Sequence, residues 1–110
     1  MPPEITPFQR AEWRPLPHPG CANVEVRPLL RAERVSLAQL RFGPHGTIHE
    51  HPADIAIDVV CLEGSGWTSV DGEAAPIAAG QKVRWPAGRA HRLWTEDNSM
   101  LTLMVEHANP

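Results

Sequence analysis

Cysteine is scarce in this chain. Only Cys21 and Cys61 occur among its 110 residues, and they lie far apart. Two widely spaced cysteines cannot build the disulfide framework of a small secreted domain or the ligand set of a Cys-rich zinc site. We expect both to be free thiols that pack as small apolar side chains. The length suits one domain with one hydrophobic core.

A basic surplus and a long apolar run are also missing. Ten Lys and Arg residues stand against thirteen Asp and Glu residues, so the net charge is −3. This balance predicts no binding to nucleic acid or to an anionic membrane surface. No apolar run is long enough to span a bilayer, and Met1–Glu4 does not begin a secretory signal. We therefore expect a cytoplasmic protein.

Proline and glycine, in contrast, are frequent. Twelve prolines and eight glycines leave little room for long helices and favour short strands joined by turns. Residues 1–22 are predicted to form an extended, proline-rich N-terminal arm, and residues 23–110 a single barrel domain. Phe8 and Trp13 are apolar anchors that would pack the arm on its own domain or on a second copy; a partly disordered tail is the alternative.

Alternating apolar and polar residues indicate strands rather than helices. Asp71-Gly72 is typical of a type I′ hairpin turn, and a shift in the pattern within 35–42 suggests a bulge. The segments with strand character are 24–27, 35–42, 55–62, 67–70, 82–85, 91–94 and 101–105. Strands this short and this closely spaced predict an all-β sandwich or barrel.

Two histidines stand two residues apart, at His49 and His51. On a strand, such residues point to the same face with Cα atoms about 6–7 Å apart. Their imidazoles can then bind one metal ion together. The pair alone also fits an exposed, polar strand end. Other residues are needed to distinguish a metal site from such a strand end.

Two glycine-anchored segments carry a more specific pattern. The first runs from Gly43 through His49 and His51 to Gly64, and the second from Gly80 through Pro86-Ala87-Gly88 to His91. In spacing, order and separation they resemble the two motifs of the cupin superfamily, and the resemblance covers roughly residues 35–107.

The resemblance is to a small, single-domain, RmlC-like cupin. It implies an all-β fold, the double-stranded β-helix (jelly-roll) cupin barrel. It also implies that His49, His51 and His91 point into the barrel from neighbouring strands and bind a divalent transition metal. The expected metal is Fe, Mn, Ni, Cu or Zn.

The fourth ligand of the family pattern is missing. The family places a glutamate between the first two histidines and the closing glycine. In this chain that position is Ile55 when it is counted forward from His51, and Ile57 when it is counted back from Gly64. Asp54 and Asp58 have the opposite strand parity, so a regular strand turns both out of the barrel. A bulge would turn one of them inward as a fourth ligand.

Three neutral imidazoles leave the full charge of the metal for its bound water or substrate, which favours an anionic ligand. The predicted function is a metal-dependent enzyme of dioxygenase, isomerase or lyase type acting on a small organic anion. A non-catalytic binding or sensing cupin, and a cupin that has lost its metal, are the alternatives. No inward carboxylate that could act as a general base can be named from the sequence.

We also expect a homodimer. The arm is longer than closing one small barrel requires, and outward apolar residues within 55–62 would otherwise leave an exposed patch. Trp94, with the opposite parity from His91, should face outward, whereas Leu93 and Thr95 should face inward.

Overall fold

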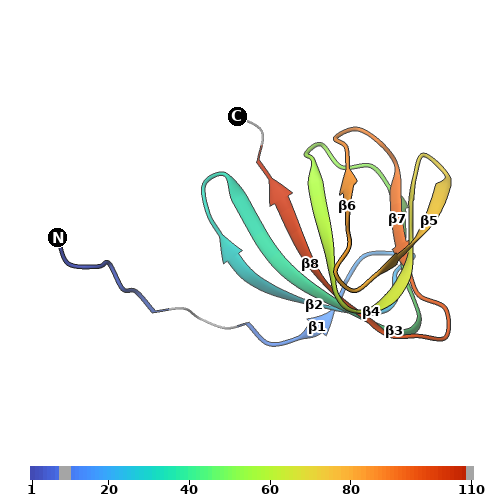
Figure 1. The fold of residues 1–110 in the computed structure, drawn as a ribbon, viewed down its shortest axis with the longest axis horizontal. Helices are drawn as coiled ribbons and strands as arrows, with labels where there is room; N and C mark the ends of the chain where they lie inside the picture. The colour runs from blue at the N-terminus through green and yellow to red at the C-terminus, as the bar shows by residue number, and fades with distance from the viewer. Residues whose placement is uncertain (8–10, 109–110) are drawn as a thin grey trace.

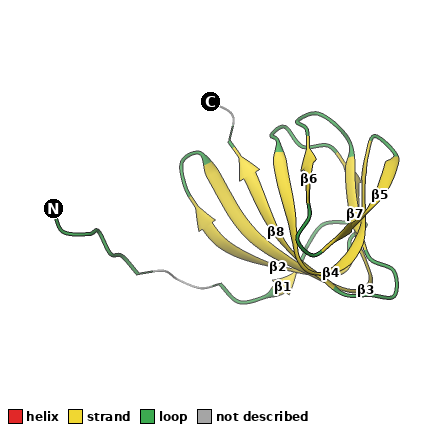
Figure 2. Cartoon of the chain, viewed as in Figure 1, coloured by secondary structure: helices red, strands yellow, loops and turns green. Residues whose placement is uncertain are grey.

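A computed structural model describes residues 1–7 and 11–108. Within these ranges the chain forms strands and turns only, so no helix there could cross a membrane (Figure 2). The strands, labelled in Figure 1, are β1 Arg14–Pro15, β2 Ala22–Arg31, β3 Val35–His51, β4 Ile57–Val70, β5 Glu73–Ala78, β6 Lys82–Trp85, β7 His91–Trp94 and β8 Met100–His107.

Two long strands, β3 and β4, close the barrel. The first half of each pairs with β8, and the second half of each pairs with β7. Because β7 and β8 each pair with both β3 and β4, these four strands form a closed barrel. Strand β2 pairs with β3, and β5 and β6 pair with β4. All of these pairs are antiparallel. The all-β, jelly-roll barrel predicted from the sequence is confirmed.

The barrel interior holds the hydrophobic core. Its buried apolar residues are Val24, Leu40, Phe42, Ile48, Ile57, Val59, Cys61, Ile77, Trp85, Leu93 and Met100. Both cysteines are free, and Cys61 is fully buried whereas Cys21 is half-buried. Burial raises the pKa of the Cys61 thiol, against a smaller opposite effect of the Glu63 backbone, so this thiol stays protonated and inert.

A bulge lies near the expected position but in the neighbouring strand. The register between β3 and β8 is continuous from Val35 to Phe42. Strand β2 instead contains one extra residue between the pairs Pro28↔Ala38 and Leu30↔Leu37. The extra residue therefore belongs to β2, and β3 has no bulge between residues 35 and 42, where it pairs with β8.

Part of the N-terminal segment joins the barrel. The Leu16 amide donates to the Val24 carbonyl at 3.0 Å, and the guanidinium groups of Arg27 and Arg41 lie 4.5 and 4.3 Å from the centre of the Trp13 ring. Residues 1–7 extend away from the barrel (Figure 1). Phe8, the other expected anchor, lies outside the described residues.

Candidate metal centre and cavity

A cavity of about 760 Å³ lies among β2, β3, β4 and β8, and Trp85 of β6 and His91 of β7 also line it. Its walls are mostly aliphatic, with His51 and His91 among the polar exceptions. The aliphatic side chains include Leu16, Val26, Leu40, Ile48, Ile55 and Ile57. A concave, largely apolar site with a few polar groups is the usual form of a small-molecule binding site.

A bulge in β3 brings His51 to the cavity. Ile48 pairs with Leu93, and His51 pairs with His91, so β3 has one residue more than β7 between the two pairs. Strict alternation would put Ile48 and His51 on opposite faces, but the extra residue allows both to line the cavity. Consequently the rings of His51 and His91 lie edge to face, with centroids 4.6 Å apart.

His49 is a neighbour of His51 but does not line this cavity. Its ring centroid is 5.1 Å from that of His51, and its Nδ1 is 3.7 Å from the Cys21 thiol. Gly20, at φ +82°, packs so closely that an added Cβ would lie 2.9 Å from the His49 Cβ. The segment Gly20–Cys21 therefore covers His49 and restricts its side chain.

The hydrogen bond of His51 determines its tautomer. His51 Nδ1 is 2.9 Å from the His49 carbonyl oxygen. A carbonyl only accepts, so Nδ1 carries the proton and Nε2 of the neutral ring keeps its lone pair. Metal-binding histidines are commonly oriented in this way.

His91 is neutral at pH 7 and has an unsatisfied nitrogen. Burial, followed by the proximity of His51, lowers its pKa to about 4, although the Arg89 backbone acts in the opposite direction. Its Nδ1 is buried and makes no hydrogen bond to any residue that the structure describes. Buried polar atoms without a partner are uncommon, and a functional site is one of their explanations.

Trp85 holds the ring of His91 in place. The two rings are stacked, with centroids 4.0 Å apart and planes 6° apart. Trp85 Nε1 donates to the Thr68 hydroxyl at 3.0 Å, and that hydroxyl donates to the Arg92 carbonyl at 3.0 Å. Both bonds fix the indole, and through it His91. The sequence identified Trp85 only as a large apolar residue, since stacking between β6 and β7 has no local signal.

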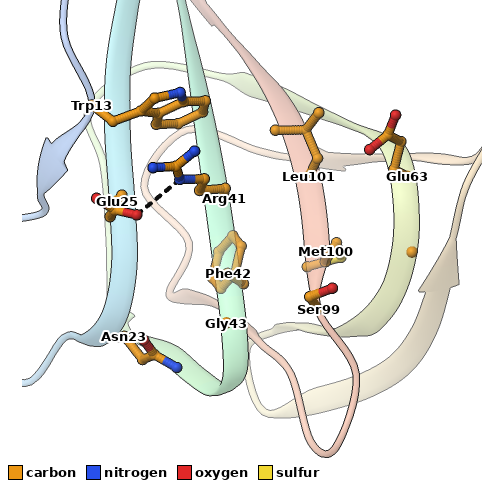
Figure 3. A pocket seen from close by; sticks show the side chains of 11 residues that line it. Trp13, Asn23, Glu25, Arg41, Phe42, Gly43, Glu63, Ser99, Met100 and Leu101 are labelled. Atoms are coloured by element: carbon orange, nitrogen blue, oxygen red, sulfur yellow. Dashed lines mark hydrogen bonds and ion pairs between the residues drawn. The ribbon is translucent and has the colours of Figure 1, made fainter.

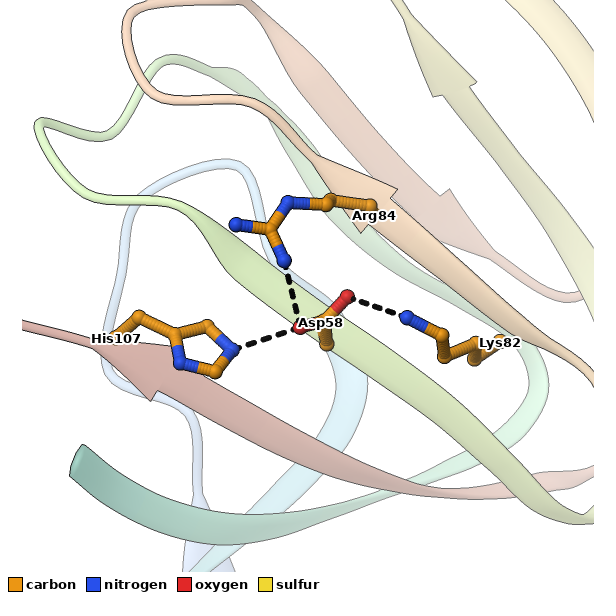
Figure 4. Close-up of polar contacts among 4 residues, drawn as sticks. All are labelled: Asp58, Lys82, Arg84 and His107. Atoms are coloured by element: carbon orange, nitrogen blue, oxygen red, sulfur yellow. Dashed lines mark hydrogen bonds and ion pairs between the residues drawn. The ribbon is translucent and has the colours of Figure 1, made fainter.

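Asp58 lies on the outside of the barrel, where it is surrounded by cations (Figure 4). Its carboxylate accepts hydrogen bonds from Lys82 at 3.0 Å, Arg84 at 3.2 Å and His107 at 2.7 Å. Burial raises the pKa of this carboxyl, but the hydrogen bonds and charges of its partners outweigh that effect and lower it. Ile57, not Asp58, lines the cavity, and Asp54 is exposed. Neither aspartate reaches the cavity wall.

Among residues 1–7 and 11–108, no three His, Cys, Asp or Glu side chains already stand as a group that could hold a metal ion. The donor chemistry nevertheless fits a divalent transition metal. His51 has a free Nε2, His91 has an unsatisfied nitrogen, and neutral imidazole is a common ligand of such metals.

Glu106 is a cavity residue that the sequence analysis did not predict. It follows Thr102 and Met104 at intervals of two on β8, and these are buried or packed against the core. The same periodicity turns Glu106 inward, and it lines the cavity. The strand predicted from the sequence ended at residue 105, one residue before this carboxylate.

A second cavity, about 480 Å³, is lined by a different set of residues (Figure 3). Trp13, Glu25 and Arg41 line it, and Arg41 is paired with Glu25 at 2.8 Å. Arg41 and Glu25 are thus already paired with each other, and none of the three candidate ligands lines this cavity.

Comparison with known proteins supports the fold. No protein-family model and no curated protein sequence matches the chain. Among solved structures, the polyketide cyclase RemF from Streptomyces resistomycificus is 20% identical, with a TM-score of 0.85 over 96% of this chain and 81% of that chain. An RmlC-like cupin from Shewanella frigidimarina is 13% identical, with a TM-score of 0.79 over 90% and 85%.

A cupin-like protein from Thermotoga maritima is 18% identical, with a TM-score of 0.77 over 91% of this chain and 79% of that chain. At these identities the similarity establishes the fold and not the activity. The chain has the fold of RmlC-like cupin domains, as its two glycine-anchored motifs predicted.

Proposed function

We propose that His49, His51 and His91 bind one divalent transition metal ion, and that the protein is a metal-dependent enzyme acting on a small organic molecule in the 760 Å³ cavity. The observation that carries the proposal is the pair His51 and His91. Their rings are 4.6 Å apart at the wall of an apolar cavity, and one buried nitrogen of His91 has no partner among the described residues.

Each histidine has a distinct part in this proposal. His51, held by the His49 carbonyl, presents Nε2, and His91 is held by Trp85. His49 must turn its ring from the Cys21 thiol toward His51 to complete the set. A bound ion of this kind would polarise an oxygen atom of the ligand. The aliphatic walls would exclude water and so strengthen the electrostatic interactions of the ligand.

The ligand that fits best has a bulky apolar body and one oxygen anion. The apolar walls favour the body, and a three-histidine site leaves the metal charge for the anion. The proposed reaction is of dioxygenase, isomerase or lyase type. Binding without turnover is the competing function.

The test is metal analysis of protein purified without an affinity tag. Fe(II), Mn(II), Ni(II), Cu(II) and Zn(II) are supplied in turn, and bound metal is measured per chain. One ion per chain supports the proposal, and His91→Ala should weaken binding by orders of magnitude. His45→Ala is the matched control, because the His45 side chain is 74% exposed and does not line the cavity. Stoichiometric binding of none of the five metals would contradict the proposal.

The homodimer and the cytoplasmic location expected from the sequence stay predictions. Leu62, on the outer side of β4, is 40% exposed, and Leu103 of the neighbouring β8 is half-buried. Trp94 stacks on Trp67 at 6.5 Å, whereas Leu93 and Thr95 are buried. The outer face therefore offers apolar side chains for contact with a second copy.

A further inference from the structure

Glu106 is a carboxylate that faces the cavity from β8. It stands in one row with Ile57 and Trp85, because Glu106 pairs with Ile57 and Ile57 pairs with Trp85. All three line the cavity. Two strand spacings of about 4.8 Å separate the Cα atoms of Glu106 and Trp85 by about 10 Å. Because Trp85 is stacked on His91, the backbone of Glu106 lies two strands away from the residue that holds that histidine.

The Glu106 carboxylate makes no hydrogen bond or ion pair to any residue that the structure describes. It is half-buried, so water reaches it only in part. An ionised carboxylate can only accept hydrogen bonds. A ligand that fills the cavity without offering a donor would displace that water and leave the charge unpaired, which is unfavourable.

We propose that Glu106 selects the ligand by accepting a hydrogen bond from a hydroxyl or ammonium group at the end remote from the histidines. The ligand class is then an apolar molecule with an oxygen at the histidine end and a hydrogen-bond donor at the other. This inference rests on the proposed function in one respect, namely that the cavity binds a small organic molecule. It does not depend on turnover.

Two probes test the proposal. 2-Naphthol carries one hydroxyl, which can serve the histidine end, whereas 2,6-dihydroxynaphthalene carries a second at the opposite end. Their affinities are measured by calorimetry for the full chain, with and without Zn(II). The wild-type protein should bind the diol about tenfold or more tightly than 2-naphthol, as expected for a hydrogen bond to a charged group. Equal affinity for the two probes, or binding of neither, would overturn the proposal.

Variants then assign the preference to Glu106. Glu106→Leu should remove the preference for the diol while keeping or improving the binding of 2-naphthol. Glu106→Gln keeps the shape of the side chain and one hydrogen-bond acceptor, so it should retain part of the preference for the diol. This variant replaces Glu106→Leu in the test if the leucine variant does not fold. Glu33→Leu is the matched control, because Glu33 is exposed in the turn between β2 and β3 and does not line the cavity. A preference that survives in Glu106→Leu, or is lost in Glu33→Leu, contradicts the proposal.

Failure of this inference is distinguishable from failure of the proposed function. The ratio of the two probe affinities reports on Glu106 alone. The metal content of the same preparations, and the effect of His91→Ala on both probes together, report on the histidines. A diol preference that depends on Glu106 in protein that binds no metal would keep the inference and reject the metal site.

Discussion

Asp58 and Glu106 are one step apart on paired strands, yet they face opposite sides of the barrel. Asp58 pairs with Val105, and Ile57 pairs with Glu106. Asp58 lies outside and accepts hydrogen bonds from Lys82, Arg84 and His107 (Figure 4). Glu106 lies inside and has no partner among the described residues. The difference separates a structural carboxylate from one available to a ligand.

Distance along the sequence from the two histidines does not predict which carboxylate reaches the cavity. Asp58 was a candidate ligand because it follows the H-x-H motif closely, but strand parity places it outside. Glu106 is far from the motif in sequence, and the pairing of β8 with β4 brings it to the cavity that contains His51 and His91.

Replacing Asp58 by Ala should give the largest change in stability. The substitution leaves Lys82, Arg84 and His107 without their carboxylate, although all three can still be solvated because they are 60, 57 and 40% exposed. We expect a loss of about 1–2 kcal/mol in the free energy of unfolding, measured with urea. Asp97→Ala, at a side chain that is 93% exposed, is the control and should change little. An unchanged stability in Asp58→Ala would mean that its three contacts are not stabilising.

The outer face should also determine assembly. Leu103→Lys places a charge among the apolar outer residues of β8 and β4, so it should convert a dimer into a monomer. Light scattering should give twice the chain mass of 12.1 kDa for the wild-type protein and the chain mass for the variant. Glu106→Gln, which changes the inner face, should leave the dimer intact. A wild-type protein with the monomer mass at micromolar concentration would exclude this assembly.

Acid should reveal the interactions of Asp58 as a change in stability. Its pKa in the folded state lies below the ordinary value of an aspartate carboxyl, about 3.9, so the folded protein holds the charged form more strongly than the unfolded chain does. The stabilisation is complete above that value and is lost as the pH falls through the lower, folded pKa. The stability difference between wild type and Asp58→Asn should therefore shrink below about pH 4. A difference that is constant from pH 6 to pH 2 would disagree with the lowered pKa.

Glu106→Gln should have the smallest effect on folding. No contact with a described residue is lost, and the amide is less costly to bury than an unpaired carboxylate. We expect the free energy of unfolding to change by less than about 0.5 kcal/mol, or to rise slightly. A destabilisation as large as that of Asp58→Ala would show that Glu106 has a structural role after all.

Sequence reasoning predicted the fold well because its signals are local. Alternating apolar residues predicted an all-β sandwich or barrel, and the resemblance of the two glycine-anchored segments to the cupin motifs implied a jelly-roll barrel with His91 beside His51. The bulge at residues 49–50, the cover of His49 by Gly20–Cys21 and the stacking of Trp85 on His91 depend on pairing between distant segments. Local periodicity carries no information about those contacts. Glu106 could have been found by extending the alternation of Thr102 and Met104 by one more step.

The most direct test is the metal content of four matched proteins. Wild type, Asp58→Ala, Glu106→Gln and His91→Ala are purified without a tag, loaded with each of the five metals and analysed for bound ion per chain. The three-histidine site predicts one ion per chain in the first three proteins and a loss of orders of magnitude in affinity for His91→Ala. If Asp58→Ala weakens binding as much as His91→Ala, or if the wild-type protein binds no metal, the site described here is wrong.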